Sequence, residues 1–117
     1  MKILALLKMS ENVGEPPQEL FEAMDATIKE VDASVRNLDT NGLLPTAQAA
    51  TRLSVTAGTV TVVDGPFTES RELVGGYAYF DVDTFADGVA AARKIFQVHV
   101  DTWPAWEGEI EVRQVMG

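Results

Sequence analysis

Residues 2–9, Lys-Ile-Leu-Ala-Leu-Leu-Lys-Met, form a nearly continuous apolar run close to the start of the chain. The run is too short for a typical helix and is bounded by polar residues. This pattern is typical of a strand that is buried on both faces. A sheet built around such a strand needs a covering layer on each side.

Two amphipathic helices are predicted to provide one of these layers. Apolar residues recur at steps of three and four from Gln18 to Leu38, which indicates a helix that Asn41-Gly42 ends. Asp83 or Thr84 is placed to cap a second helix. The apolar stripe predicted for this second helix comprises Phe85, Val89, Ala92, Ile95 and Phe96.

The remaining strands are predicted from alternating apolar and polar residues. Residues 51–56 and 59–63 alternate on either side of Ala57-Gly58, which predicts a hairpin. Tyr77–Val82 and Glu109–Met116 are predicted as two further strands. With the hairpin counted as an elaborated second strand, the order is β-α-β-β-α-β. This is the ferredoxin-like plan, an α+β fold, in a single domain of residues 1–117 with an extra hairpin.

Two helices can cover only one face of this sheet. The first strand nevertheless appears apolar on both faces, and Tyr77, Tyr79 and Phe80 place aromatic groups on both sides of another strand. We therefore expect a second copy of the chain to cover the other face. The sequence thus predicts a homodimer with sheet-on-sheet packing across a two-fold axis.

Charge and composition exclude several classes of partner and site. Eighteen acidic against nine basic side chains give a net charge of −9, which disfavours nucleic acids and anionic membranes as partners. The chain has no cysteine, so disulfides and thiolate catalysis are excluded. One histidine and scattered carboxylates do not form a metal-ligand cluster, and no dinucleotide fingerprint is present. We therefore predict no metal and no cofactor.

The N-terminal apolar run is also too short for an export signal. Lys8 interrupts it after Leu7, and no stretch of the chain approaches the roughly 20 apolar residues of a membrane span. We therefore expect a cytoplasmic protein.

The segment Asp64-Gly65-Pro66-Phe67 directly follows the predicted hairpin. Pro66 fixes φ at about −65°, and Gly75-Gly76 further on gives the backbone extra freedom, so we expect a stiff, shaped loop between two strands. Asp64 at its entrance has two interpretations. It faces a cavity as a general base or hydrogen-bond acceptor, or its carboxylate caps the turn.

His99 is the only side chain whose ordinary pKa lies near neutrality. It is expected to follow the second helix, in front of a loop rich in Trp and Pro from Asp101 to Gly108. A His99–Asp101 pair is suited to proton transfer, whereas a lone histidine after a helix more often interacts with the helix dipole or solvent. Trp103 and Trp106 in this loop form either a lid over a pocket or part of the core packing.

Alternation places Tyr77, Tyr79 and Asp81 on one face of their strand, and Ala78, Phe80 and Val82 on the face that meets the helices. We expect the tyrosines to face the dimer side, together with Arg113 or Gln114 of the last strand. This arrangement suits either an aromatic-lined ligand chamber or an ordinary interface. The predicted ligand-binding residues are Pro66, Phe67, Tyr77, Tyr79 and Arg113.

The run Val63-Asp-Gly-Pro-Phe-Thr-Glu-Ser-Arg-Glu72, followed by Gly75-Gly76-Tyr77, resembles the YCII-related family in its DGPF-domain branch. The similarity extends over nearly the whole chain. It includes Leu44-Pro45-Thr46, Thr51-Arg52-Leu53, Phe96-x-x-His99, Trp103-Pro104 and the segment from Glu107 to Arg113.

This resemblance implies a dimeric α/β-barrel fold and a largely uncharacterised function. Enzymatic activity is suspected in the wider family because a histidine and an aspartate recur there, and Asp64 falls within the matching motif. The only histidine here, His99, lies in a C-terminal segment typical of the DGPF branch. Some relatives are encoded beside, or fused to, alternative sigma factors, which implies a regulatory role as a separate alternative.

Together these observations predict a dimeric protein with a cavity near the Asp64 loop. The cavity is expected to bind a small organic ligand, with Asp64 and His99 as candidates for acid–base chemistry. The alternative is a non-catalytic module that senses a ligand or contacts a transcription factor of the sigma type. A third interpretation gives the Asp64 loop a purely structural role.

Overall fold

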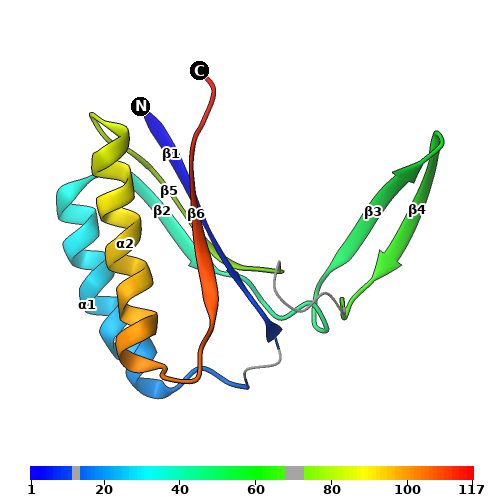
Figure 1. The fold of residues 1–117 in the computed structure, drawn as a ribbon, viewed down its shortest axis with the longest axis horizontal. Helices are drawn as coiled ribbons and strands as arrows, with labels where there is room; N and C mark the ends of the chain where they lie inside the picture. Colours follow the sequence, from blue (N-terminus) through cyan, green and yellow to red (C-terminus); the bar gives the residue numbers. More distant parts are fainter. Residues whose placement is uncertain (12–13, 68–72) are drawn as a thin grey trace.

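The computed structural model describes residues 1–11, 14–67 and 73–117 (Figure 1). No helix formed by these residues is long and apolar enough to cross a membrane. The elements in chain order are β1 (Lys2–Met9), α1 (Gln18–Ser34), β2 (Arg36–Gly42), β3 (Thr51–Thr56), β4 (Thr59–Asp64), β5 (Leu73–Asp81), α2 (Phe85–Thr102) and β6 (Gly108–Gln114).

Four strands form an antiparallel sheet in the order β2-β5-β1-β6, and both helices lie on one of its faces (Figure 1). The strand predicted at residues 2–9 is confirmed as β1, which pairs with β5 on one edge and β6 on the other. The α+β class is likewise confirmed. This sheet and its two helices are compatible with a ferredoxin-like fold.

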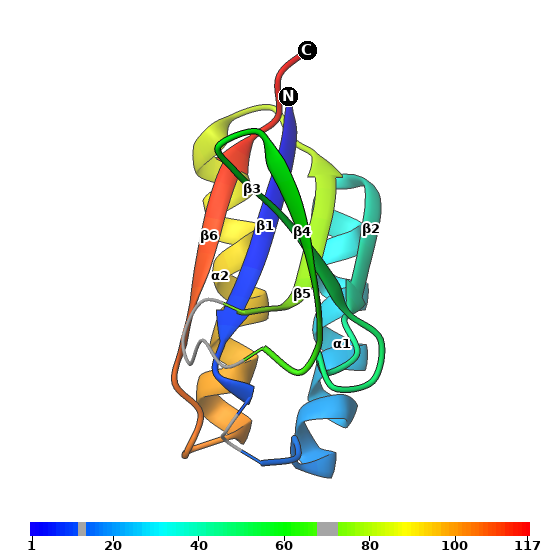
Figure 2. The same cartoon turned by 90° about the vertical axis from the view of Figure 1, so that its right-hand side faces the viewer.

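The main core lies between the sheet and the helices. Ile3 and Ala5 of β1 pack there with Val31 of α1 and Ile95 of α2. The face predicted for β5 is confirmed, because Ala78, Phe80 and the following Val82 belong to this core. The opposite face of the sheet carries no helix, and we call it the open face (Figures 1 and 2).

The prediction of a helix up to Leu38 is wrong. Helix α1 ends at Ser34, and Arg36–Gly42 form the edge strand β2. Val35 and Leu38 still pack against the core, so the apolar pattern continues across the boundary although the backbone changes from helix to strand. The second strand of the β-α-β-β-α-β plan is therefore β2, not the hairpin as predicted.

The expectation that Gly75 and Gly76 give freedom to a loop is also wrong. Both lie inside β5, which begins at Leu73, and neither has a positive φ. Their role is to leave room for neighbouring chain. A Cβ on Gly75 would lie 2.6 Å from Sδ of Met9, and one on Gly76 would lie 3.2 Å from the carbonyl oxygen of Asn41.

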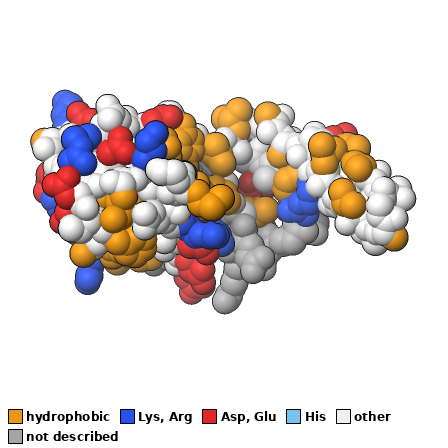
Figure 3. Space-filling model, turned by 90° about the horizontal axis from the view of Figure 1, so that it is seen from above, with side chains coloured by type: hydrophobic (Ala, Val, Ile, Leu, Met, Phe, Trp, Pro, Cys, Tyr) orange, Lys and Arg blue, Asp and Glu red, His pale blue; other side chains and the backbone are white. Residues whose placement is uncertain are grey.

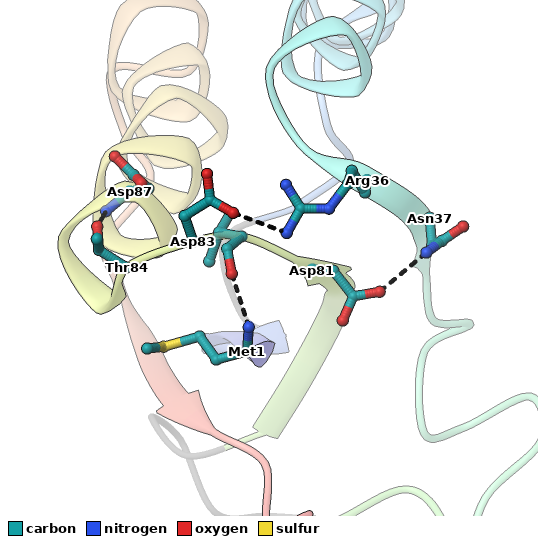
Figure 4. Close-up of polar contacts among 8 residues, drawn as sticks. Met1, Arg36, Asn37, Asp81, Asp83, Thr84 and Asp87 are labelled. Atoms are coloured by element: carbon teal, nitrogen blue, oxygen red, sulfur yellow. Dashed lines mark hydrogen bonds and ion pairs between the residues drawn. The ribbon is translucent and has the colours of Figure 1, made fainter.

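Helix α2 is capped as predicted but is rotated relative to the predicted stripe. The Thr84 hydroxyl accepts a hydrogen bond from the Asp87 backbone N–H at 3.1 Å (Figure 4). Phe85 and Val89, expected in the core, are instead exposed. The buried residues of the helix are Gly88, Ala91, Ala92, Ile95 and His99.

Polar contacts at the same end of the sheet hold the start of the chain (Figure 4). The amino group of Met1 donates to the carbonyl oxygen of Val82 at 2.7 Å. Asn37, which has a φ of 55°, donates from Nδ2 to Asp81 Oδ2 at 2.9 Å. A left-handed residue at this point accompanies the register shift between β2 and β5, and asparagine tolerates that conformation better than most residues.

The predicted hairpin is confirmed as β3 and β4, joined at Ala57-Gly58, both with positive φ. It forms a separate two-stranded sheet, which projects from the body on the side of the open face (Figures 1 and 2). We call residues 51–64 the arm. The last predicted strand is confirmed as β6, with its limits at Gly108 and Gln114.

The closest approach of α2 to the sheet gives a test of the core. A Cβ on Gly88 would lie 2.8 Å from Cγ1 of Ile3. Gly88→Ala should therefore lower the free energy of unfolding by about 1–3 kcal/mol through overpacking. Alanine also stabilises a helix by about 1 kcal/mol relative to glycine, so the net loss should be up to about 2 kcal/mol.

Urea unfolding measures this change, and Gly42→Ala is the matched control. A Cβ at Gly42 would meet only Gly75 O, at 3.9 Å, so this variant should unfold close to the wild-type midpoint. Equal stability of the two variants would contradict a close contact between α2 and β1.

Candidate functional site

A cavity of about 770 Å³ lies between α1 and the helix-covered face of the sheet. Its lining is mainly apolar and draws on both helices and on the central strands. Small side chains of the sheet, Ala5 and Ala78, lie on the floor, and the larger residues of α1 lie across from them. The apolar residues contributed by the two helices and the following turn include Leu20, Met24, Ile28, Ile95 and Trp103.

His99 contributes an imidazole to this apolar lining. It lies in the last turn of α2 and is only 6% exposed. Its Nδ1 lies 2.9 Å from the carbonyl oxygen of Ile95. Since a carbonyl only accepts, Nδ1 carries the proton and Nε2 is left with a free lone pair in the neutral ring.

Burial lowers the pKa of His99 from its ordinary value, and the backbone hydrogen bond to Ile95 opposes this shift only in part. The ring is therefore neutral at pH 7. It packs against Trp106 with 5.0 Å between the ring centroids. His99 thus offers a hydrogen-bond acceptor in mainly apolar surroundings.

Two expectations about His99 are corrected by this geometry. The residue lies inside α2, not after it, because the helix extends to Thr102. Asp101 does not orient the ring, since its Oδ1 accepts a hydrogen bond from Gln97 Nε2 at 2.9 Å. Residues 99 and 101 point in different directions on a helix, whereas residues four apart are neighbours.

Both tryptophans are part of the core packing, which was one of the two interpretations of the sequence. Trp103 and Trp106 are buried and share a cluster with Leu7 and Leu20. Phe96 meets the Trp106 ring edge-on, with 5.4 Å between the centroids. Trp106 Nε1 is buried without a hydrogen-bond partner among the residues that the structure describes.

A chain of hydrogen bonds links the rim of the cavity to the Asp64 loop. Glu11, which lines the cavity, accepts from the Thr46 backbone N–H and from the Thr46 hydroxyl, both at 2.7 Å. The same hydroxyl oxygen accepts from the Phe67 backbone N–H at 3.0 Å. Thr46 therefore joins the loop to the cavity rim.

Gly65 allows the loop to pack closely against Thr46. Its N–H donates to the carbonyl oxygen of Ala50 at 2.9 Å, and the Gly65-Pro66 peptide bond is cis. A Cβ at Gly65 would lie 1.8 Å from the Thr46 carbonyl oxygen, so no side chain can be accommodated there. The Arg52 guanidinium lies over the Phe67 ring, 4.1 Å from its centroid. These contacts hold the described part of the loop, whereas its residues 68–72 lie outside the described residues.

Asp64 ends β4 at the base of the arm, where its side chain is exposed. Oδ1 accepts a hydrogen bond from the Thr51 hydroxyl at 2.9 Å. Asp64, Pro66 and Phe67 are not among the residues that line the cavity. The structure therefore does not bring Asp64 and His99 into one site, and the role of each stays a prediction.

Tyr77 and Tyr79 share the open face, as alternation predicted, and of the two alternatives in the last strand, Arg113 and Gln114, it is Arg113 that lies on this face. Leu4 lies opposite Tyr79 on one side and Arg113 on the other. The Tyr77 hydroxyl donates to Asp39 Oδ1 at 3.1 Å. Tyr77 is also among the residues that line the cavity, whereas Tyr79 and Arg113 are not.

The polar residues at the rim of the cavity were not predicted from the sequence. Glu11 and Thr46 are 35 residues apart and lie in irregular segments, so no periodic pattern marks either of them. The apolar stripe of α1, by contrast, supplied Leu20, Met24 and Ile28 of the lining. Among the described residues, no group of three or more histidines and carboxylates is placed to hold a metal ion.

No protein-family model matches the chain, and the curated proteins contain no match to it.

The lowered pKa of His99 predicts a pH dependence of stability. The unfolded chain takes up a proton at a pH near 6.5, whereas the folded chain resists it until lower pH. Stability should therefore fall as the pH decreases below about 6.5, by at most about 1.4 kcal/mol per pH unit from this one group. The loss ends below the lowered pKa.

Urea unfolding of the wild type and of His99→Phe, measured from about pH 5 to about pH 8, tests this pH dependence, because histidine titrates in this range. The variant should lack this part of the pH slope, whereas Asp101→Asn, two residues further on and exposed, should retain it. Identical slopes for the wild type and His99→Phe would show that the imidazole is not held neutral by burial.

Proposed function

We propose that this protein binds a small, largely apolar organic molecule in the cavity between α1 and the sheet. The observation that carries this proposal is a neutral imidazole with a free acceptor nitrogen in an apolar cavity of about 770 Å³. Ligand sites in proteins are typically concave, apolar and supplied with a few placed polar groups, and about 300–1,000 Å³ is their usual size.

The chemistry of the lining narrows the ligand class. A molecule that donates one hydrogen bond, such as a phenol, alcohol or amide, satisfies Nε2 of His99. The net charge of −9 and the Glu11 carboxylate at the rim disfavour anionic ligands. The ligand is therefore expected to be neutral or cationic, with an apolar body that fills the space beside Met24 and Ile28.

Binding is better supported than acid–base catalysis. Proton transfer to His99 would create an imidazolium in an apolar site, and the lowered pKa opposes this step. Among the described residues, no carboxylate is hydrogen-bonded to the ring to stabilise the charge, and Nδ1 contacts a backbone carbonyl. Catalysis by Asp64 and His99 together would require a rearrangement that joins the arm to the cavity.

A homodimer is part of the proposal. Leu4 and Leu6 of β1 are only half-buried and point to the open face, as do Tyr77 and Tyr79. A second sheet packed there would exclude water from these side chains. Membership of the DGPF branch, which rests on the run from Val63 to Glu72, would imply the same dimer.

Naphthalene and naphthol, which differ by one hydroxyl, test the ligand site. Naphthol should bind the wild type more tightly, because its O–H can donate to His99 Nε2. A net hydrogen bond of about 1 kcal/mol corresponds to roughly a fivefold difference in dissociation constant. In His99→Phe the acceptor is lost and the two probes should bind with similar affinity.

Isothermal titration calorimetry measures the affinities, and shifts of amide NMR resonances near Leu20 and Ile28 report the location. Asp64→Asn serves as the comparison variant, because Asp64 lies outside the cavity lining and should leave both affinities unchanged. Absence of binding of either probe, or a preference for naphthol that survives in His99→Phe, would refute the proposed site.

A further inference from the structure

The arm carries four aliphatic side chains on one of its faces. Leu53 lies opposite Val62, and Val55 lies opposite Val60, and residues two apart in a strand share a face. These side chains are 68%, 63%, 70% and 58% exposed, respectively. The other face of the arm is more polar, with Ser54 opposite Thr61.

The part of the chain that the structure describes leaves this apolar face exposed. A two-stranded hairpin is marginally stable in water unless its apolar face packs against another surface. The arm forms a sheet of its own, outside both hydrophobic clusters of the body. Apolar side chains that are exposed together in this way mark either an interaction surface or a site of aggregation.

Hydrogen bonds at the base of the arm connect the hairpin to the body. Gly65 donates to the carbonyl oxygen of Ala50, which joins the two ends of the hairpin to each other, and Phe67 donates to the Thr46 hydroxyl. Thr46 in turn donates to Glu11, which follows β1 of the body. The arm consequently projects on the side of the open face and away from the helices (Figures 1 and 2). Apolar side chains are seen both on the arm and on the adjoining body in Figure 3.

We propose that the apolar face of the arm docks on a second copy of this chain. This inference rests on the homodimer proposed above and assigns to the arm a specific part of its interface. Each copy would extend its arm along the other, while the two open faces pack against each other. The arm would thus contribute side chains to the interface that the sheet alone does not supply.

The area of the two surfaces supports a second copy as the occupant. Four strands spaced by ~4.8 Å, each with about seven residues at ~3.4 Å, give the open face a footprint of roughly 450 Å². A stable interface needs about 800 Å² from each partner. The open face alone falls well short of this.

The arm closes this difference only if the dimer is symmetric. Two strands of about six residues give the arm a footprint of roughly 200 Å². In a two-fold dimer each chain both extends its own arm and receives the partner's, so the arm counts twice. The open face and the arm of one chain together give roughly 650 Å², and the surface that receives the partner's arm adds to this, which brings each chain toward the roughly 800 Å² of a standard interface.

A buried charge on the apolar face tests this arrangement. Val62→Asp should shift the protein from dimer to monomer and raise the dissociation constant about a hundredfold or more. The substitution occurs twice in each dimer, and each buried carboxylate should weaken binding by roughly tenfold or more. Thr61→Asp adds the same charge to a β-branched residue on the opposite face and should leave the dimer intact.

Sedimentation equilibrium of the full chain over a range of concentrations gives the dissociation constants. Circular dichroism checks that the body stays folded, which is expected because Val62 belongs to neither core cluster. A second measurement uses the absence of cysteine from the chain. The thiol of Val62→Cys should react with a maleimide several-fold more slowly than that of Thr61→Cys, and dilution to monomer should remove this difference.

The outcomes separate the arm from the dimer itself. A wild-type protein that is monomeric at every concentration would overturn both the homodimer and the role of the arm. A dimer that Val62→Asp does not weaken, with equal thiol reactivity on the two faces, would overturn the arm alone. Equal dissociation by Val62→Asp and Thr61→Asp would show that charge on the arm, not its apolar face, controls assembly.

Discussion

The packing of β1 against α2 is the constraint on which the rest of the structure depends. β1 is hydrogen-bonded on both edges, and its inward side chains Ile3, Ala5 and Leu7 are buried. Gly88 allows α2 to approach Ile3 so closely that a methyl group would clash. Once this contact is made, β5 and β6 are positioned on either side of β1 and the helices are confined to one face.

The cavity follows from the sizes of the side chains on that face. Toward one end of the sheet, the large residues of the core give way to Ala5, Gly76 and Ala78, and all three line the cavity. Protein interiors are otherwise packed to the density of organic crystals, so space of this size beneath a helix needs small residues below it. His99 enters the same space from α2, where burial keeps its imidazole neutral.

Local patterns explain which features could be predicted from the sequence. Alternation placed Ala78 and Phe80 in the core and Tyr79 on the open face, because a strand has a strict period of two. The end of α1 was missed because Val35 and Leu38 continue the apolar stripe while the backbone becomes a strand. The Glu11–Thr46 contact has no local signal at all, since it joins two loops brought together only by the folded sheet.

The Asp64–Phe67 segment is best understood as the joint between the arm and the body. Gly65 is required by contact with the Thr46 carbonyl, and the Phe67 N–H is bound by the Thr46 hydroxyl. Asp64 holds the two strands of the arm together through Thr51. Packing and hydrogen bonding thus give Asp64, Gly65 and Phe67 contacts within the fold. Thr46 also binds Glu11 at the cavity rim. The segment that connects the arm to the body therefore also positions one wall of the cavity.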